Sequence, residues 1–301
     1  MIWATLTGIP LGLLAAAGGE GGAFDAGEMI LHHVSNGAAW IEGAWWSPSK
    51  AVLVMAVAAL LVILGVRRAL AGYDENGVPR SRWAQMMDPF VEHFYRDVAM
   101  AYAGPKWARR VAPLLLTFFF FILTNNLLGL IPWADLLNLV RGVAVPAESE
   151  PGAFKTFVLD GAGTPTGNFN VTVALALVTF FAIIVFGVKK HGLVGHFAQL
   201  APKGVPWPVR WFLLLPIETM SMFVKPFALT MRLAANMTAG HMAILAIVAI
   251  IFLLNSVLVG IPAVGLAVGI NLLEIIVCFV QAYVFALLSG VFIGMAIESH
   301  H

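Results

Sequence analysis

The chain has 301 residues, of which 60% are hydrophobic and 11% are charged, and its formal net charge is +1. A soluble domain carries about 25% charged residues, so this composition excludes a soluble fold and indicates an integral membrane protein. The single cysteine, Cys278, excludes a disulfide framework and a thiolate metal site, and we expect no metal, no cofactor and no nucleic-acid partner.

The first 49 residues contain no Lys and no Arg. They begin with "MIWATLTGIPLGLLAAAGG", a short apolar run followed by small residues that a signal peptidase could cleave. The run lacks the basic residues that precede a secretory signal. We expect residues 1–50 to form an external N-terminal segment with a signal-like start, and residues 51–301 to form a membrane channel domain.

Three uncharged runs predict the first membrane spans, at residues 51–66, 111–134 and 169–188. Between the first two lies a segment in which large apolar residues recur at helical spacing: Trp83, Met87, Phe90, Phe94, Val98 and Tyr102. This pattern predicts an amphipathic helix at the membrane interface. The alternative is a polar loop with scattered aromatic residues.

The last third of the chain is apolar for longer than two upright spans require. The sequence "VGIPAVG" at 259–265 predicts a break, because Pro262 and its neighbouring glycines would end a helix. One helix would then cover about 209–257, roughly 70 Å, and another about 264–297. A bilayer core is about 30 Å thick, so we expect a long, strongly tilted hairpin. Hydropathy alone leaves two or three spans open.

The basic residues predict the topology. Twelve of the 17 Lys and Arg residues lie in 67–110 and 189–210, whereas 132–168 has two basic residues against four acidic ones. Basic loops stay on the cytoplasmic side. The fold class is therefore an all-α integral membrane protein with about five transmembrane helices and one interfacial helix. We expect it in the inner membrane of a bacterium, with an external N-terminus and a cytoplasmic C-terminus.

A polar stripe runs along the first of the two long helices. Glu218, Lys225 and Arg232 are spaced seven apart and share one face, which Asn236 joins. Ionisable groups inside a membrane line cavities or form pairs. Glu218 and Lys225 could pair with each other. Arg232 stays charged and has no obvious carboxylate partner in the chain, so we expect its partner to be supplied from outside.

The last helix carries a second polar stripe, formed by Asn271, Glu274 and Gln281. With the break at 259–265, a simple hairpin does not bring Gln281 to the level of Arg232. A tilted crossing could do so, and Glu274 would then lie near the level of His241. The alternatives are purely structural: Gln281 and Asn236 could form hydrogen bonds between helices, and His241 could be a buried histidine whose hydrogen bonds are made within the protein.

The segments that carry these residues resemble subunit a of F-type ATP synthases. The similar stretches are "KPFALTMRLAANMTAGH", "PLLLTFFFFILTNNLLGLIP" and "LLEIIVCFVQAYVFALLSGVFIGMAIESHH", within about residues 80–300. The resemblance implies a stator channel beside a rotating ring of c subunits, whose mid-membrane carboxylate would be the missing anion. It also implies peripheral-stalk b subunits, the other ATP synthase subunits and membrane lipid as partners.

The same resemblance assigns roles to residues. Arg232 would face the ring carboxylate, with Gln281 near it. His241 and Glu274 would line the external half-channel, and Glu218 and Asn236 would belong to the path near the cytoplasmic side. Many bacterial relatives have a carboxylate where His241 stands and an imidazole where Glu274 stands, so the pair is exchanged here. One acid and one imidazole remain, which preserves a proton relay.

The function expected is proton translocation coupled to ring rotation, by a subunit that is not a catalyst alone. A secondary transporter that binds an anionic substrate through Arg232 is the alternative, although the sequence lacks the inverted repeats of that class. A membrane protease would need a serine–histidine pair or metal ligands within the spans, where only His241 qualifies.

Overall fold

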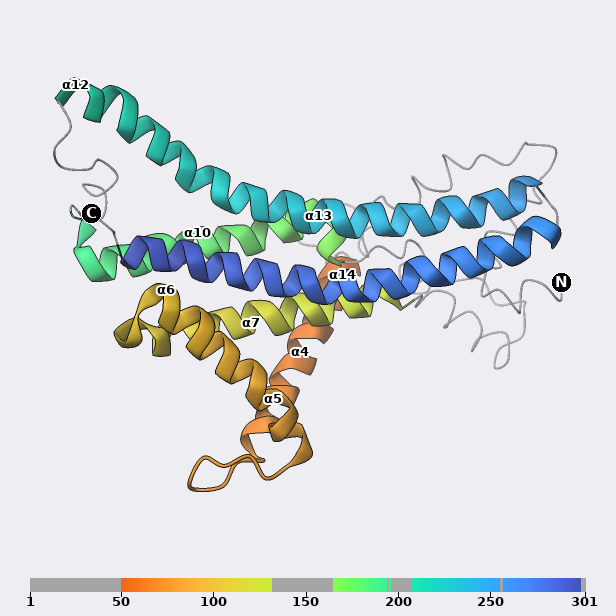
Figure 1. Cartoon of the computed structure of the whole chain (residues 1–301), viewed down its shortest axis with the longest axis horizontal. Coiled ribbons are helices and arrows are strands. Elements are labelled where there is room, and N and C mark those ends of the chain that lie inside the picture. Colours follow the sequence, from red (N-terminus) through yellow and green to blue (C-terminus); the bar gives the residue numbers. More distant parts are fainter. Residues whose placement is uncertain (1–49, 132–164, 194, 196–206, 255–256, 299–301) are drawn as a thin grey trace, which may run out of the picture. The chain divides into compact units, whose positions relative to one another are not determined.

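The computed structural model describes residues 50–131, 165–193, 195, 207–254 and 257–298, and these residues are almost entirely helical (Figure 1). Within them the only pairing of strand type is an isolated bridge between Tyr73 and Pro79. The elements in chain order are α4 (Lys50–Leu70), α5 (Arg82–His93), η1 (Phe94–Met100), α6 (Ala101–Ala103), α7 (Pro105–Leu130), η2 (Pro165–Gly167), α10 (Phe169–His191), α12 (Trp207–Val209), η3 (Arg210–Leu214), α13 (Leu215–Leu254) and α14 (Val257–Ile297).

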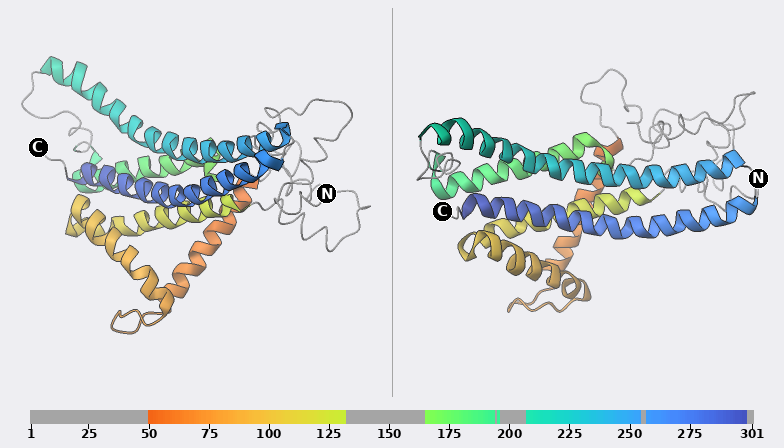
Figure 2. Two further views of the ribbon diagram at one scale, coloured as in Figure 1. Left: turned by 45° about the vertical axis from the view of Figure 1, so that its right-hand side comes forward. Right: turned by 45° about the horizontal axis from the view of Figure 1, so that its top comes forward.

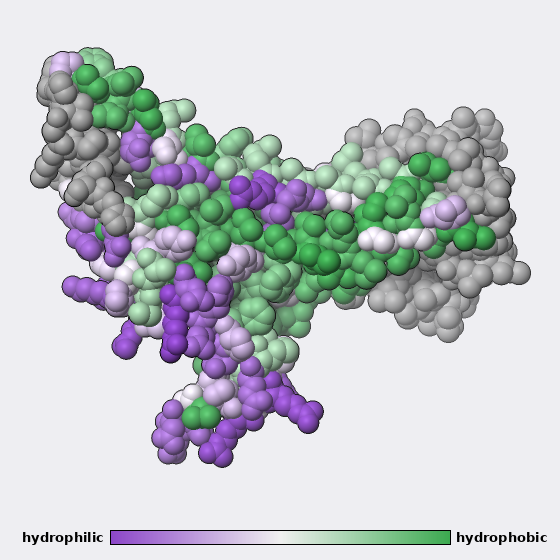
Figure 3. All heavy atoms as spheres, in the orientation of Figure 1, coloured by the Kyte–Doolittle hydropathy of each residue, from purple (hydrophilic) through white to green (hydrophobic). Residues whose placement is uncertain are grey.

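Five helices of the described chain are long and apolar enough to cross a membrane, which confirms the predicted number of spans. They cover Ala51–Leu70, Pro105–Leu130, Phe169–His191, Phe212–Ile247 and Gly260–Ile297. Figure 3 shows hydrophobic colouring over most of the long helices, and hydrophilic colouring over the loop that joins α4 to α5. The predicted external segment 1–50 lies, except for Lys50, outside the described residues, so its separation from the membrane domain stays a prediction.

The two last helices are confirmed as long elements, because α13 has 40 residues and α14 has 41 (Figures 1 and 2). The predicted break at 259–265 is wrong. In the described residues α13 ends at Leu254 and α14 begins at Val257, and Pro262 is inside α14. Proline and glycine are tolerated in membrane helices because neighbouring groups satisfy the freed carbonyl.

The chain forms two compact units, which are described separately. The first contains 125–168 and 235–278 together with the start of the chain, and the second contains 58–124, 169–234 and 279–301. In the first unit, Asn126 at the end of α7 is fully buried. Its Nδ2 donates to the carbonyl of Cys278 in α14 at 3.2 Å, and its Oδ1 accepts from Thr166 at 2.6 Å. One amide therefore joins three segments.

In the second unit, the predicted amphipathic helix is confirmed as the continuous run α5, η1 and α6. Phe94 is fully buried, with ring centroids 5.2 Å from Phe119 of α7 and 5.9 Å from Tyr283 of α14. Trp83 and Tyr102 were expected on the same face but are 37% and 42% exposed. Trp83 instead contacts α4, where its Nε1 donates to the carbonyl of Gly65. Tyr102 follows η1, a seven-residue π-helix whose wider turns shift the register of later residues.

Small residues let α14 approach this amphipathic run closely. Ala282, Ala286, Gly290 and Gly294 recur every four residues and are all buried. A Cβ at Gly290 would lie 2.8 Å from Cγ1 of Val98, and one at Gly294 would lie 2.5 Å from the carbonyl oxygen of Tyr102. Membrane helices pack through such small-residue stripes, because burying apolar area gives them no advantage over lipid.

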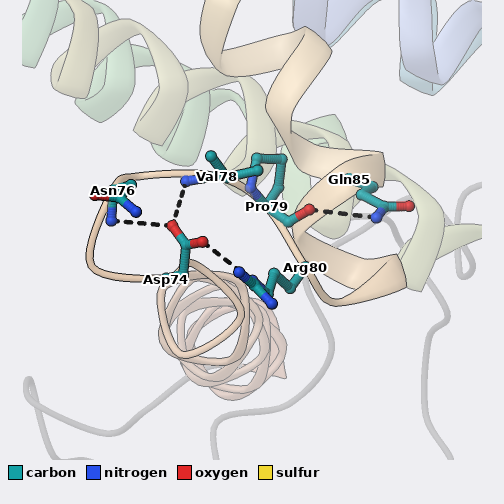
Figure 4. Close-up of polar contacts among 6 residues, drawn as sticks. All are labelled: Asp74, Asn76, Val78, Pro79, Arg80 and Gln85. Atoms are coloured by element: carbon teal, nitrogen blue, oxygen red, sulfur yellow. Dashed lines mark hydrogen bonds and ion pairs between the residues drawn. The ribbon is translucent and has the colours of Figure 1, made fainter.

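A polar network fixes the loop between α4 and α5 (Figure 4). The carboxylate of Asp74 accepts hydrogen bonds from the amides of Asn76 and Val78 at 3.0 and 2.9 Å and from Nε of Arg80 at 3.0 Å. These donors, the Val78 amide first, lower the pKa of Asp74 below its ordinary value. Gly77 supplies the left-handed turn with a φ of 75°.

Candidate functional site

Arg232 lies on α13, on a face that the rest of the described chain leaves uncovered. Its side chain is exposed, and so are its apolar neighbours Phe227 and Met231, at 57% and 44%. No carboxylate of the described residues forms an ion pair with the guanidinium. The arrangement is a permanent cation on an exposed helix face, and among the described residues it lacks the carboxylate partner whose absence the sequence analysis expected.

Lys225, another charged residue of the predicted polar stripe, has a contact partner within the second unit. Its Nζ lies 5.9 Å from the centroid of the Phe292 ring of α14, in a cation–π contact. Glu218 is half-buried, and no ion pair joins it to Lys225 among the described side chains. The alternative of an internal Glu218–Lys225 pair is therefore wrong in this structure.

The Lys225–Phe292 contact also sets the antiparallel register of α13 and α14 in the second unit. Arg232 follows Lys225 by seven residues. In an antiparallel pair the residue at its level on α14 is then Phe285, seven residues before Phe292, and Gln281 is four residues from Phe285. Gln281 is thus within about one helical turn of the level of Arg232. The register mismatch in the sequence analysis came from placing the break too late. Gln281 is half-buried, whereas Asn236 on α13 is exposed.

Glu274 is the buried member of the predicted set, in the first unit. It is 2% exposed, and neither carboxylate oxygen has a hydrogen-bond donor among the described residues. Its side chain fills the space beside Gly240, where a Cβ would lie 2.6 Å from Oε1. A buried carboxylate in that state is costly unless a proton, water or counter-charge reaches it.

Gly240 directly precedes His241, so the packing puts the backbone of His241 near the depth of Glu274. His241 belongs to α13, but its side chain lies outside the described residues. Sequence reasoning missed the role of Gly240, for which the only signal was a glycine inside a helical run. It also did not predict the hydrogen bonds that join Asn126 to α14 and Thr166.

A comparison with known families covers most of the chain. The sequence model of the family described as "ATP synthase A chain" matches residues 51–294, which is most of the chain. The chain belongs to the ATP synthase subunit a family. It is therefore part of the F-type ATP synthase complex, as the proton-channel stator subunit of the F0 sector and a multi-pass membrane protein, and the transporter alternative has no support.

Several relatives named as subunit a of ATP synthase are similar over much of their length. The protein from Chloroherpeton thalassium is 37% identical over 259 residues, covering 84% of this chain and 68% of its own. That from Anaeromyxobacter sp. is 37% identical over 257 residues, covering 84% and 55%. ATP synthase subunit a 2 of Prosthecochloris aestuarii is 36% identical over 300 residues, covering 94% and 83%.

Proposed function

We propose that this member of the subunit a family forms two offset proton half-channels against a ring of c subunits and couples proton flow to rotation of the ring. We place it in the inner membrane of a bacterium, with the N-terminus external and the C-terminus cytoplasmic. Its further partners would be the b subunits of the peripheral stalk. The distribution of Lys and Arg supports this orientation.

One observation carries the proposal: Arg232 is exposed on a membrane helix and has no anionic partner in the described chain. A cation at membrane depth is expensive without a partner. A carboxylate of a ring subunit would supply one. At about 4 Å and an effective dielectric constant of about 20, the two charges attract by roughly 4 kcal/mol. That attraction keeps the ring site ionised while it passes Arg232.

The fixed charge of Arg232 also separates the two half-channels, because a proton cannot hop directly past it. Glu274 and His241 would form the external half-channel, and Glu218 and Asn236 would serve the cytoplasmic half-channel, with Gln281 close to Arg232. A proton that enters from outside must then travel round on the ring. Each charge that crosses 100 mV releases about 2.3 kcal/mol, which the ring converts into rotation.

Replacing the charge tests the proposal. In inverted vesicles that hold the assembled complex, Arg232→Ala should abolish ATP-driven proton pumping, while passive proton leak through F0 persists. Arg232→Lys should also fail in pumping, because a desolvated lysine can lose its proton and lacks the planar fork of arginine. The matched control is Lys225→Gln, which removes a cation of the same helix that rests on Phe292.

We expect Lys225→Gln to retain most of the pumping. Pumping is followed with a fluorescent pH indicator, and assembly by the co-purification of the c-ring and the peripheral ATPase. Near-normal pumping by Arg232→Ala in an assembled complex would overturn the mechanism.

A further inference from the structure

Three helix ends of the second unit meet at one place. Nε2 of His191, the last residue of α10, lies 2.9 Å from the carbonyl oxygen of Ile297, the last residue of α14. The side chain of Glu298 fills the space beside Gly104, where a Cβ would lie 2.7 Å from Oε1, and α7 begins one residue later. The views of Figures 1 and 2 agree that these ends lie together.

Basic side chains gather at this junction, which we call the basic junction. It consists of the residues at the start of α7 and the end of α10: Lys106, Arg109, Arg110, Lys189 and Lys190. All five are exposed, and none forms an ion pair with a carboxylate of the described residues. Glu298 brings one negative charge to the same place, so a clear positive excess remains.

Trp107 connects the two groups of cations. Its indole ring lies 6.2 Å from the ring of Phe186, one turn before Lys189 and Lys190, in an edge-on contact. The guanidinium of Arg110 lies over the same indole at 5.2 Å. Trp107 is 7% exposed, and its buried Nε1 has no acceptor among the described residues. A buried donor that has no acceptor among the described residues is costly, and an acceptor brought to the junction would relieve that cost.

The depth of the basic junction identifies the kind of acceptor. The cations lie within two turns of the start of the span Pro105–Leu130 and at the end of the span Phe169–His191. They are therefore at the height of lipid headgroups, on the side that the positive charges assign to the cytoplasm. Basic pockets between membrane helices on that side bind anionic headgroups. The planar fork of Arg109 or Arg110 matches the oxygens of a phosphate.

We propose that the basic junction binds the headgroup phosphate of an anionic glycerophospholipid, held by Lys189, Lys190, Arg109 and Arg110 beside Trp107. The site is separate from Arg232 and does not depend on the proposed proton path. Arg67 and Arg68 provide the contrast, because they form a basic pair in the last turn of α4. They have the same charge as the lysine pair and also lie near a second basic helix end, the start of α5 at Arg82. The difference is that the indole Nε1 of Trp83 beside Arg82 donates to the carbonyl of Gly65 at 2.8 Å, so this donor is satisfied within the chain.

The test uses the purified complex in membranes that contain phosphatidylcholine and a photoactivatable phosphatidylglycerol, with crosslinked peptides mapped by mass spectrometry. We expect crosslinks in the peptides of 105–110 and 186–191, at a higher yield than with a photoactivatable phosphatidylcholine. Each cation near an anionic surface strengthens binding by about fivefold. The double variant Lys189→Gln, Lys190→Gln should therefore lower the yield at least fivefold, and Arg67→Gln, Arg68→Gln should leave it unchanged.

Other results would overturn the proposal. Equal labelling by the two lipids would mean that the junction does not select charge, and an equal loss in both double variants would mean a general surface effect. Displacement of the crosslink by millimolar glycerol phosphate would identify a site for soluble phosphates instead. If the lysine variant does not assemble, the crosslinking of the unchanged complex is repeated at a higher salt concentration. Screening must then reduce the preference for phosphatidylglycerol, and an unchanged preference would overturn the proposal.

Discussion

Arg232 and Glu274 represent two ways in which a membrane helix carries an ionisable group. Arg232 lies on an exposed face of α13, and no carboxylate of the described residues forms an ion pair with it. Glu274 is buried, and it fits because Gly240 has no side chain in the space that the carboxylate fills. The first arrangement suits an electrostatic contact between subunits, and the second suits a group that exchanges a proton inside the protein.

The pairing of Glu274 with His241 leads to a prediction about proton flux. We expect His241→Ala and Glu274→Ala each to slow flux strongly, because one acid and one imidazole at similar depth would form the relay. The exchange His241→Glu with Glu274→His should keep more flux than either single loss, since it restores both chemistries. Flux is measured in vesicles with an imposed proton gradient. An exchange variant no better than the worse single variant would refute the pairing.

Asp74 gives a prediction outside the membrane spans. Its pKa is lowered in the folded loop, so the ionised carboxylate stabilises the loop above the unfolded pKa of about 3.9 and that stabilisation is lost as the pH falls through the lower folded value. We expect the amides of Asn76 and Val78 to lose protection against hydrogen exchange, relative to intrinsic rates, in that acid range. Asp74→Asn should remove this pH dependence. A variant with the same acid transition would assign it to another group.

At the scale of elements, the small-residue stripe of α14 determines how closely the amphipathic run packs. Gly294→Leu must push the backbone of Tyr102 away, and overpacking of this kind costs about 1–3 kcal/mol. Gly269→Leu on the same helix is the matched control, because a Cβ there meets no atom within 4 Å. We expect a lower thermal unfolding temperature for the complex only with Gly294→Leu. Equal shifts would mean that the stripe does not set the packing.

The elements that sequence alone predicted are those with a strong local pattern. The five spans, the amphipathic run and the exposed Arg232 follow from runs of apolar residues, helical spacing and isolated charge. The break between α13 and α14 was misplaced because Pro262 is a weaker signal in membrane helices than in soluble ones. The place of Gly240 against Glu274 and the bonds of Asn126 depend on contacts between distant segments, which one sequence does not reveal.

At the scale of the whole molecule, the length of α13 predicts how it lies in the bilayer. Its 40 unbroken residues extend about 60 Å, twice the thickness of a bilayer core. Apolar residues are exposed near both of its ends, with Ile217 at 56% and Ile250 at 45%. An upright helix would place one of these ends in water, so we expect α13 and α14 to lie strongly tilted.

Cysteine scanning with a membrane-impermeant maleimide, on a Cys278→Ala background, tests this tilt. Between 225 and 245 we expect labelling only at positions that recur every three to four residues, because a tilted continuous helix exposes one face to a channel. Residues 75–77, in the loop between α4 and α5, should label at every position and serve as the control. Labelling at consecutive positions within 225–245 would reveal a water-exposed loop there. It would replace the tilted pair with three upright spans.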